Sequence, residues 1–167
     1  MRNLVRLAVL GEKELKMKKV LISACLLGDN VKYSGGNNLS NELIALLKKY
    51  DIQLVPVCPE MLGGLPTPRP PAEKLNGDIV TVTGESVLAE FQFGAERVLN
   101  KAQTEKIEVA ILKEKSPSCG SHYIYDGSFS GKLISGEGVT ASLLKQNGIA
   151  IFSENNLSEL EQLFNSQ

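Results

Sequence analysis

Hydrophobic residues follow two kinds of pattern along this chain: short continuous apolar runs, and longer stretches in which apolar residues recur every three or four positions. Apolar runs of strand length cover 20–24, 52–57, 107–112 and 149–152. Helical spacing, with polar residues on the opposite side, covers 40–50, 86–102, 139–146 and 157–164. Alternation at 78–83 predicts a further strand or one arm of a hairpin. Strands and helices are therefore predicted to alternate.

Local signals mark the ends of several predicted helices. Ser40 is a plausible N-cap for the first helix, and Asn155 or Asn156 opens the last one. The pair Asn147–Gly148 is a common stop signal after 139–146. The N–H groups that open this same helix suit an anion, but favourable interaction of Glu137 with the helix dipole is the simpler interpretation.

Strands that alternate with helices predict βαβ units and a largely parallel sheet covered on both faces. We therefore expect an α/β chain with a three-layer Rossmann-like fold and a mostly parallel central sheet. Two segments rich in Gly, Pro and polar residues, 61–73 and 113–137, are predicted to be loops. Because Met17 directly precedes the first strand region, residues 17–167 are expected to form a single α/β domain. Residues 1–16 are then a leader or a start-site artefact outside it.

Composition narrows the classes of partner. The 167 residues are 43% hydrophobic, enough for one domain with a real core, and the formal charge is -1. Proteins that wrap duplex nucleic acid usually carry a strongly basic face, so no duplex is expected as a partner. No apolar run approaches the roughly 20 residues that span a bilayer, and no signal-peptide cleavage pattern follows the N-terminal apolar stretch. We expect a cytoplasmic protein without a membrane partner; the pattern leaves its oligomeric state open.

The three cysteines occupy related places on this map. Cys25 follows the first predicted strand by one residue, Cys58 follows the second by one, and Cys119 lies a few residues after the third. Open α/β sheets bind ligands at the carboxyl ends of their parallel strands. Three cysteines at that edge predict a shared pocket more readily than the alternative of unrelated buried thiols.

Three thiolates favour a metal site, although the residues alone do not choose the metal. Zinc is one possibility, with His122 completing a Cys₃His set. An iron–sulfur cluster with three cysteine ligands is another, and it leaves one iron open for chemistry. A thiol hydrolase that uses Cys119 without a cluster is a third.

Polar residues beside the cysteines supply candidate chemistry. Glu60, two residues after a cysteine, is a candidate proton shuttle. Ser116 and Ser118 can bind or attack a substrate carbon, or simply cap turns. Arg69 can clamp a carbonyl or an anion, or brace the Pro-rich loop.

A set of motifs covering residues 18–154 resembles the bacterial 2-thiouracil desulfidase family, long known as domain of unknown function 523. The resemblance rests on SACLLG, YSGG, VCPEMLGGLPTPRPPAE, LKEKSPSCGS, YDGSFSGK, GEGVTA and NGI. The combination of CPE, PTPRPPAE and SPSCG is far more specific than any single short motif.

The resemblance implies a [4Fe-4S] cluster held by Cys25, Cys58 and Cys119. It implies that Glu60 is the acid–base residue and that Ser116 is the catalytic serine, with Ser118 as the close alternative. The activity implied is non-redox removal of sulfur from a small thiolated pyrimidine such as 2-thiouracil, with water as the oxygen source and sulfide as product. An exposed cluster of this kind is readily lost in air. The alternative is a binding module, stabilised by zinc or a cluster, that performs no catalysis.

Overall fold

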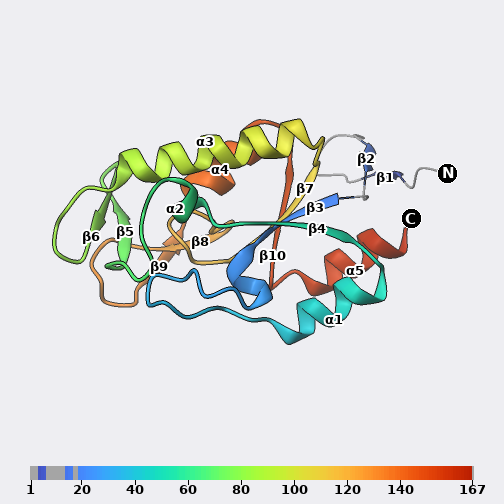
Figure 1. Cartoon of the computed structure of the whole chain (residues 1–167), viewed down its shortest axis with the longest axis horizontal. Coiled ribbons are helices and arrows are strands. Elements are labelled where there is room, and N and C mark those ends of the chain that lie inside the picture. Colours follow the sequence, from blue (N-terminus) through green and yellow to red (C-terminus); the bar gives the residue numbers. More distant parts are fainter. Residues whose placement is uncertain (1–3, 7–13, 17–18, 167) are drawn as a thin grey trace.

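The computed structural model describes residues 4–6, 14–16 and 19–166 (Figure 1). Within the N-terminal part, β1 (Leu4–Arg6) and β2 (Glu14–Lys16) pair antiparallel. Most of the predicted leader, 1–16, lies outside the described residues, so its assignment and the domain start at 17 stay predictions.

Four parallel strands form the central sheet, as the apolar runs predict. They are β3 (Lys19–Ser23), β4 (Gln53–Val57), β7 (Val109–Leu112) and β10 (Ala150–Ser153), in the spatial order β10-β7-β3-β4. Pro56 lies in β4, which is an edge strand of the sheet. Proline has no backbone N–H to donate, and edge strands are where sheets tolerate it. The order of the strands places β3 between β4 and β7, so the three strands followed by cysteines are neighbours.

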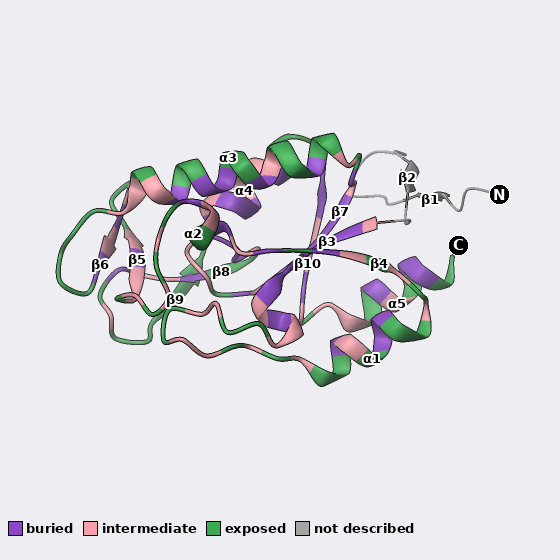
Figure 2. Ribbon diagram, viewed as in Figure 1, coloured by how far each residue is buried: buried purple, intermediate pink, exposed green. Residues whose placement is uncertain are grey.

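Helices cover both faces of this sheet, which confirms the predicted three-layer Rossmann-like α/β fold (Figure 1). One face packs against α1 (Asn41–Lys49) and α5 (Leu157–Asn165), the other against α3 (Leu88–Thr104) and α4 (Val139–Gln146). Alternate residues of β3 point to opposite cores: Val20 and Ile22 to the first, Leu21 to the second. Figure 2 shows the buried positions of these helices turned toward the sheet.

The helix boundaries largely follow the predicted caps. The Ser40 hydroxyl accepts the Leu43 N–H at 3.4 Å, and α4 spans the predicted residues. Asn156 precedes α5, but its side chain accepts the Ser153 N–H instead of capping the helix. No helix in the described ranges is both long enough and apolar enough to cross a membrane.

Two predicted loops contain regular structure that the hydrophobic pattern missed. A short helix, α2 (Pro59–Leu62), opens the first, and β5 (Ala72–Leu75) closes it by pairing with β6 (Asp78–Thr81). The second contains the hairpin of β8 (Tyr123–Tyr125) and β9 (Leu133–Ser135). Strands this short carry too few alternating positions to stand out, and their partners determine them.

Candidate active site

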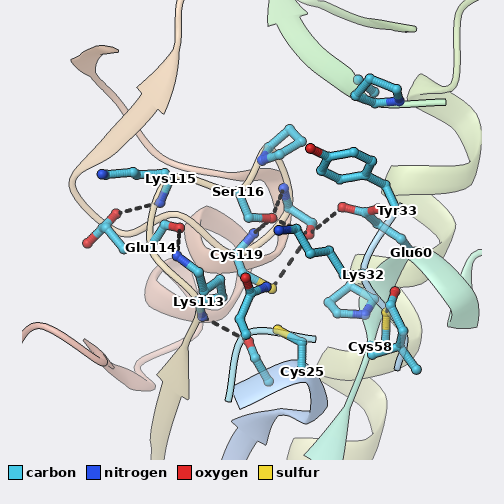
Figure 3. A pocket seen from close by; sticks show the side chains of 18 of the residues that line it. Cys25, Lys32, Tyr33, Cys58, Glu60, Lys113, Glu114, Lys115, Ser116 and Cys119 are labelled. Carbon is cyan, nitrogen blue, oxygen red and sulfur yellow. Dashed lines mark hydrogen bonds between the residues drawn. The ribbon is translucent and has the colours of Figure 1, made fainter. Parts of the chain in front are cut away.

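The three cysteines line one cavity of about 470 Å³ at the carboxyl ends of the parallel strands (Figure 3). Cys25 lies in the 3-10 turn η2 (Ala24–Leu27) directly after β3, and Cys58 is the N-cap of α2 directly after β4. Cys119 lies in the loop that follows β7. The predicted convergence of three distant thiols is therefore confirmed.

None of the three cysteines forms a disulfide. Burial is the largest influence on the pKa of each thiol. Burial raises the pKa of Cys119 to about 12, against hydrogen bonds with Ser23 and Ser118. Burial also raises the pKa of Cys25, as does negative charge on nearby Cys58, while a hydrogen bond with Asn38 opposes the rise. A metal centre offsets the cost of burying thiolates, so this donor set suits one.

The loop of the third cysteine is fastened to the N-terminus of α4. The N–H of Val139 donates to the Pro117 carbonyl at 3.0 Å, and the N–H of Thr140 donates to the Ser118 carbonyl at 2.8 Å. A Cβ at Gly138 would lie 2.4 Å from the Ser118 carbonyl carbon, so only glycine permits this approach. The first N–H groups of the helix thus serve the protein's own loop, which neither of our interpretations of this helix start anticipated.

A buried carboxylate organises the same loop from within. Glu114 accepts the N–H groups of Ser121 at 2.8 Å, His122 at 2.9 Å and Tyr123 at 3.2 Å. Burial would raise its pKa, but the hydrogen bonds from His122, Ser121 and Tyr123 outweigh burial and lower the pKa to about 2. Sequence reasoning missed Glu114, because its partners are backbone groups that no motif reveals.

His122 is not among the residues that line the cavity. Its side chain is 59% exposed, and Nδ1 lies 3.2 Å from Glu114 Oε2 and 2.9 Å from Ser121 Oγ. Within the described ranges, no three His, Cys, Asp or Glu side chains are placed to hold a single metal ion. The structure therefore does not assemble the Cys₃His arrangement considered for zinc.

Glu60 enters the cavity from α2, and Arg69 fixes its orientation. Arg69 Nε donates to Glu60 Oε2 at 2.7 Å, in an ion pair whose arginine side chain is only 6% exposed. The other guanidinium nitrogens donate to the Pro66 carbonyl, Thr67 Oγ1 and the Val31 carbonyl, at 3.1, 2.9 and 2.9 Å. All three side-chain nitrogens of Arg69 thus bind protein atoms. The predicted contact of Arg69 with a substrate stays a prediction.

Two serine hydroxyls connect to the other carboxylate oxygen. Ser118 Oγ lies 3.2 Å from Glu60 Oε1 and 3.5 Å from Cys119 Sγ, either of which can accept its proton, and 2.9 Å from Ser116 Oγ. Ser116 Oγ also accepts the N–H groups of Ser118 and Cys119, both at 3.1 Å. If Ser118 gives its single proton to Glu60, Ser116 must donate to Ser118, so the hydroxyls form a directed chain toward the carboxylate.

Two glycines set the position of α2 against α3. A Cβ at Gly94 would lie 1.9 Å from the Pro59 carbonyl oxygen, and one at Gly63 would lie 2.0 Å from the Glu90 carbonyl oxygen. The two helix backbones therefore touch directly. This contact places the turn that carries Glu60.

The far wall of the cavity comes from the β5–β6 and β8–β9 hairpins. The buried carboxylate of Glu73, on β5, accepts the N–H groups of Gly127 at 3.0 Å and Phe129 at 3.1 Å. Phe129 has φ 56°, a left-handed conformation that is uncommon for a bulky residue. Glu73 thus holds the turn that brings Phe129 into the cavity lining.

A parallel sheet that gathers three cysteines, a carboxylate and two serines at its strand ends defines a Rossmann-like α/β protein with an enzyme-type site. The chain belongs to the 2-thiouracil desulfurase family, whose sequence model matches residues 20–156. This confirms the family indicated by the motifs.

Two similar proteins extend the comparison. The Bacillus subtilis (strain 168) uncharacterized protein YbbK is 43% identical over an alignment of 151 residues, and the match covers 84% of this chain and 99% of that protein. The solved structure of the [4Fe-4S]-dependent thiouracil desulfidase TudS (DUF523Vcz) superposes with a TM-score of 0.81 at 47% sequence identity. That match covers 89% of this chain and 98% of the solved one.

Proposed function

We propose that this protein is a [4Fe-4S]-dependent, non-redox desulfidase that removes sulfur from a small thiolated pyrimidine such as 2-thiouracil. Water supplies the oxygen, and sulfide is released. One observation carries the proposal: three cysteines line one cavity with Glu60 and its serine chain, in a member of the 2-thiouracil desulfurase family. The 47% identity to a [4Fe-4S]-dependent thiouracil desulfidase supports the same cofactor and substrate class.

Cys25, Cys58 and Cys119 are the proposed ligands of the cluster. They line one cavity, yet they are not arranged around a single-ion position in the described part of the chain. Membership of the 2-thiouracil desulfurase family and 47% identity to a [4Fe-4S]-dependent thiouracil desulfidase favour an iron–sulfur cluster over one zinc ion. Three protein ligands leave one of four irons without a thiolate, and no fourth ligand comes from His122, which lies outside the cavity lining.

When bound, the cluster supplies a Lewis-acidic iron with high affinity for the soft sulfur of a thiocarbonyl. The protein's own part is proton transfer. Exchange of thiocarbonyl for carbonyl consumes one water and yields one hydrogen sulfide, so two protons move from oxygen to sulfur and no electron is needed. Glu60 is the proposed base that takes a proton from the attacking water and later returns it to the departing sulfur.

The surroundings of Glu60 fit this role. Arg69 holds Oε2, so Oε1 is the oxygen that faces the serines. Because Ser116 Oγ already accepts two backbone N–H groups, its proton points toward Ser118 or a bound substrate. Ser116 is the proposed catalytic serine, and Ser118 connects it to the base. Arg69 is a positioning residue in this scheme.

The proposed partner is a small thio-compound. Neither duplex nucleic acid nor a bilayer is proposed as a partner. The formal charge of -1 gives no general attraction to phosphate backbones. The cytoplasm is the proposed location, since unpaired thiols and an air-sensitive cluster belong in a reducing compartment.

Anaerobic purification and cluster reconstitution provide the test. Brown protein containing iron and acid-labile sulfide should convert 2-thiouracil to uracil with one sulfide released per uracil. Serine substitution of any one of the three cysteines should lose the cluster, whereas Glu60→Gln should keep the colour and lose turnover. Stoichiometric zinc without iron would instead favour the non-catalytic binding module. Cluster-loaded protein that is inactive on every thiolated pyrimidine would refute the substrate class.

A further inference from the structure

Four cationic side chains line the cavity: Lys32, Arg69, Lys113 and Lys115. Protein groups engage two of them. Arg69 is bound as described above, and Lys113 Nζ lies 2.7 Å from Glu154 Oε2 and donates to a backbone carbonyl at 2.9 Å. Lys115 is exposed, and Figure 3 shows its side chain extending away from the sulfur atoms.

Lys32 differs from the other three. Figure 3 shows its half-buried side chain crossing the cavity, with the ammonium end toward the loop that carries Ser116 and Cys119. Its ammonium lies 5.5 Å from the centre of the Tyr33 ring. Among the residues that the structure describes, no carboxylate or carbonyl accepts a hydrogen bond from Lys32 Nζ.

The backbone beneath Lys32 is firmly held. Its N–H donates to the Gly36 carbonyl at 3.0 Å, and its carbonyl accepts the Gly35 N–H at 2.8 Å, which closes a tight turn. The residues on either side are tied to Arg69: the guanidinium donates to the Val31 carbonyl, and the Arg69 N–H donates to the Tyr33 carbonyl at 2.8 Å. The backbone segment that carries Lys32 is therefore held by the same arginine that orients Glu60.

We propose that the Lys32 ammonium binds an oxo oxygen of the substrate, separate from the thiocarbonyl that reacts. The chain would therefore select thiolated pyrimidines that carry both groups, as 2-thiouracil does. This inference rests on the proposed function and deepens it by naming the contact that selects the substrate.

A contact between the Lys32 ammonium and a substrate oxygen would favour binding for a simple chemical reason. An ammonium that loses water on ligand binding needs a new acceptor, and a carbonyl oxygen at the ring edge supplies one. Water adds at the thiocarbonyl carbon, so the developing negative charge goes to the sulfur, and the contact of Lys32 with the other oxygen acts on binding and orientation of the ring.

Two substrates separate this role from general electrostatics: 2-thiouracil, and pyrimidine-2-thione, which lacks the oxo group. Lys32→Met should lower kcat/KM for 2-thiouracil by about tenfold to a hundredfold, the range for losing a hydrogen bond to a charged group. It should change kcat/KM for pyrimidine-2-thione less than about threefold, since that substrate offers no partner to lose. Lys48→Met, a control at an exposed position of α1 outside the cavity lining, should leave both values unchanged.

Binding provides a readout besides turnover. Titration calorimetry of anaerobic, cluster-loaded protein with uracil should give a larger dissociation constant for Lys32→Met than for wild type, at equal iron content. Lys32→Arg should restore part of the affinity, because it keeps the charge. Equal losses on both substrates, or unchanged uracil binding, would overturn the role of Lys32.

The two proposals fail separately. Wild-type protein that releases no sulfide from either compound would refute the desulfidase function. The calorimetric comparison of 2-thiouracil with pyrimidine-2-thione, in wild type and Lys32→Met, would still decide whether Lys32 binds the oxo group: a preference of wild type for 2-thiouracil that the substitution abolishes supports it, and no preference refutes it.

Discussion

Gly94→Ala tests whether the contact between α2 and α3 positions the catalytic carboxylate. Helix propensity alone predicts that alanine in the middle of α3 stabilises the protein by about 1 kcal/mol. Packing predicts the opposite, because the new Cβ would lie 1.9 Å from the Pro59 carbonyl oxygen, where ordinary contact begins at 3.4 Å. The short helix must then move by about 1.5 Å, the difference between these two distances.

A shift of that size exceeds what the hydrogen bonds of Glu60 tolerate. Its carboxylate lies 2.7 Å from Arg69 Nε and 3.2 Å from Ser118 Oγ, so both bonds would lengthen or break. Overpacking costs about 1–3 kcal/mol, and a buried charged hydrogen bond contributes about 1.5–3 kcal/mol. These losses exceed the propensity gain and leave a net destabilisation of about 1.5–5 kcal/mol. A misplacement of about 1 Å at a catalytic group lowers turnover by roughly a hundredfold.

The assay pairs thermal unfolding with sulfide release. Gly94→Ala should lower Tm by about 3–20 °C, given about 2–4 °C per kcal/mol in a chain of this size. The control is Asn100→Ala, an exposed position of the same helix, which should be neutral or slightly stabilising and fully active. If Gly94→Ala raised Tm and kept wild-type turnover, direct backbone contact would not be what positions Glu60.

Three further predictions concern the polar groups of the site. Glu114→Gln should cost about 3 kcal/mol of unfolding free energy near neutral pH, because the folded-state pKa of about 2 lies below the ordinary 4.5. Since this contribution is present above pH 4.5 and disappears as pH falls toward about 2, urea titrations should show the two proteins converging on acidification. Ser118→Ala and Ser116→Ala should each lower kcat by about 10²-fold, since either change interrupts the hydroxyl chain to Glu60; unaltered kcat in Ser118→Ala would mean that Ser116 acts without it. Arg69→Lys should lower kcat with little change in KM, whereas a raised KM at constant kcat would mean that Arg69 binds substrate.

Much of the site follows from where residues fall relative to predicted strands. The apolar runs at 20–24, 52–57 and 107–112 correspond to β3, β4 and β7: each start shifted by one or two residues, the end of β3 shifted by one, and the ends of β4 and β7 are as predicted. Because parallel strands end at one edge, placing Cys25 and Cys58 just after two such runs was enough to predict a shared cavity. The same logic placed Glu60 beside it.

Other parts of the site depend on contacts that leave no trace in local sequence. Glu114 resembles any loop glutamate until the chain turns back and presents several N–H groups to it. The Gly-rich stretch before α4 indicated a helix start, but not that this start would hold the loop of Cys119. No role was predicted for Lys32 from the sequence, because its neighbours along the chain do not show that its side chain crosses the cavity.

The sequence by itself determined the layer architecture, the family and the shared place of the three cysteines after strands, because periodicity, the alternation of strands with helices and dense motifs are properties of the chain along its length. Tertiary structure decided which donor meets which acceptor: that Arg69 holds Glu60, that Ser118 joins it to Ser116, and that Lys32 faces the cavity. The physical reason is range. Hydrophobic burial acts through pattern and tolerates shifts, whereas a hydrogen bond between distant residues requires positions defined to a few tenths of an ångström, which only the packed fold provides.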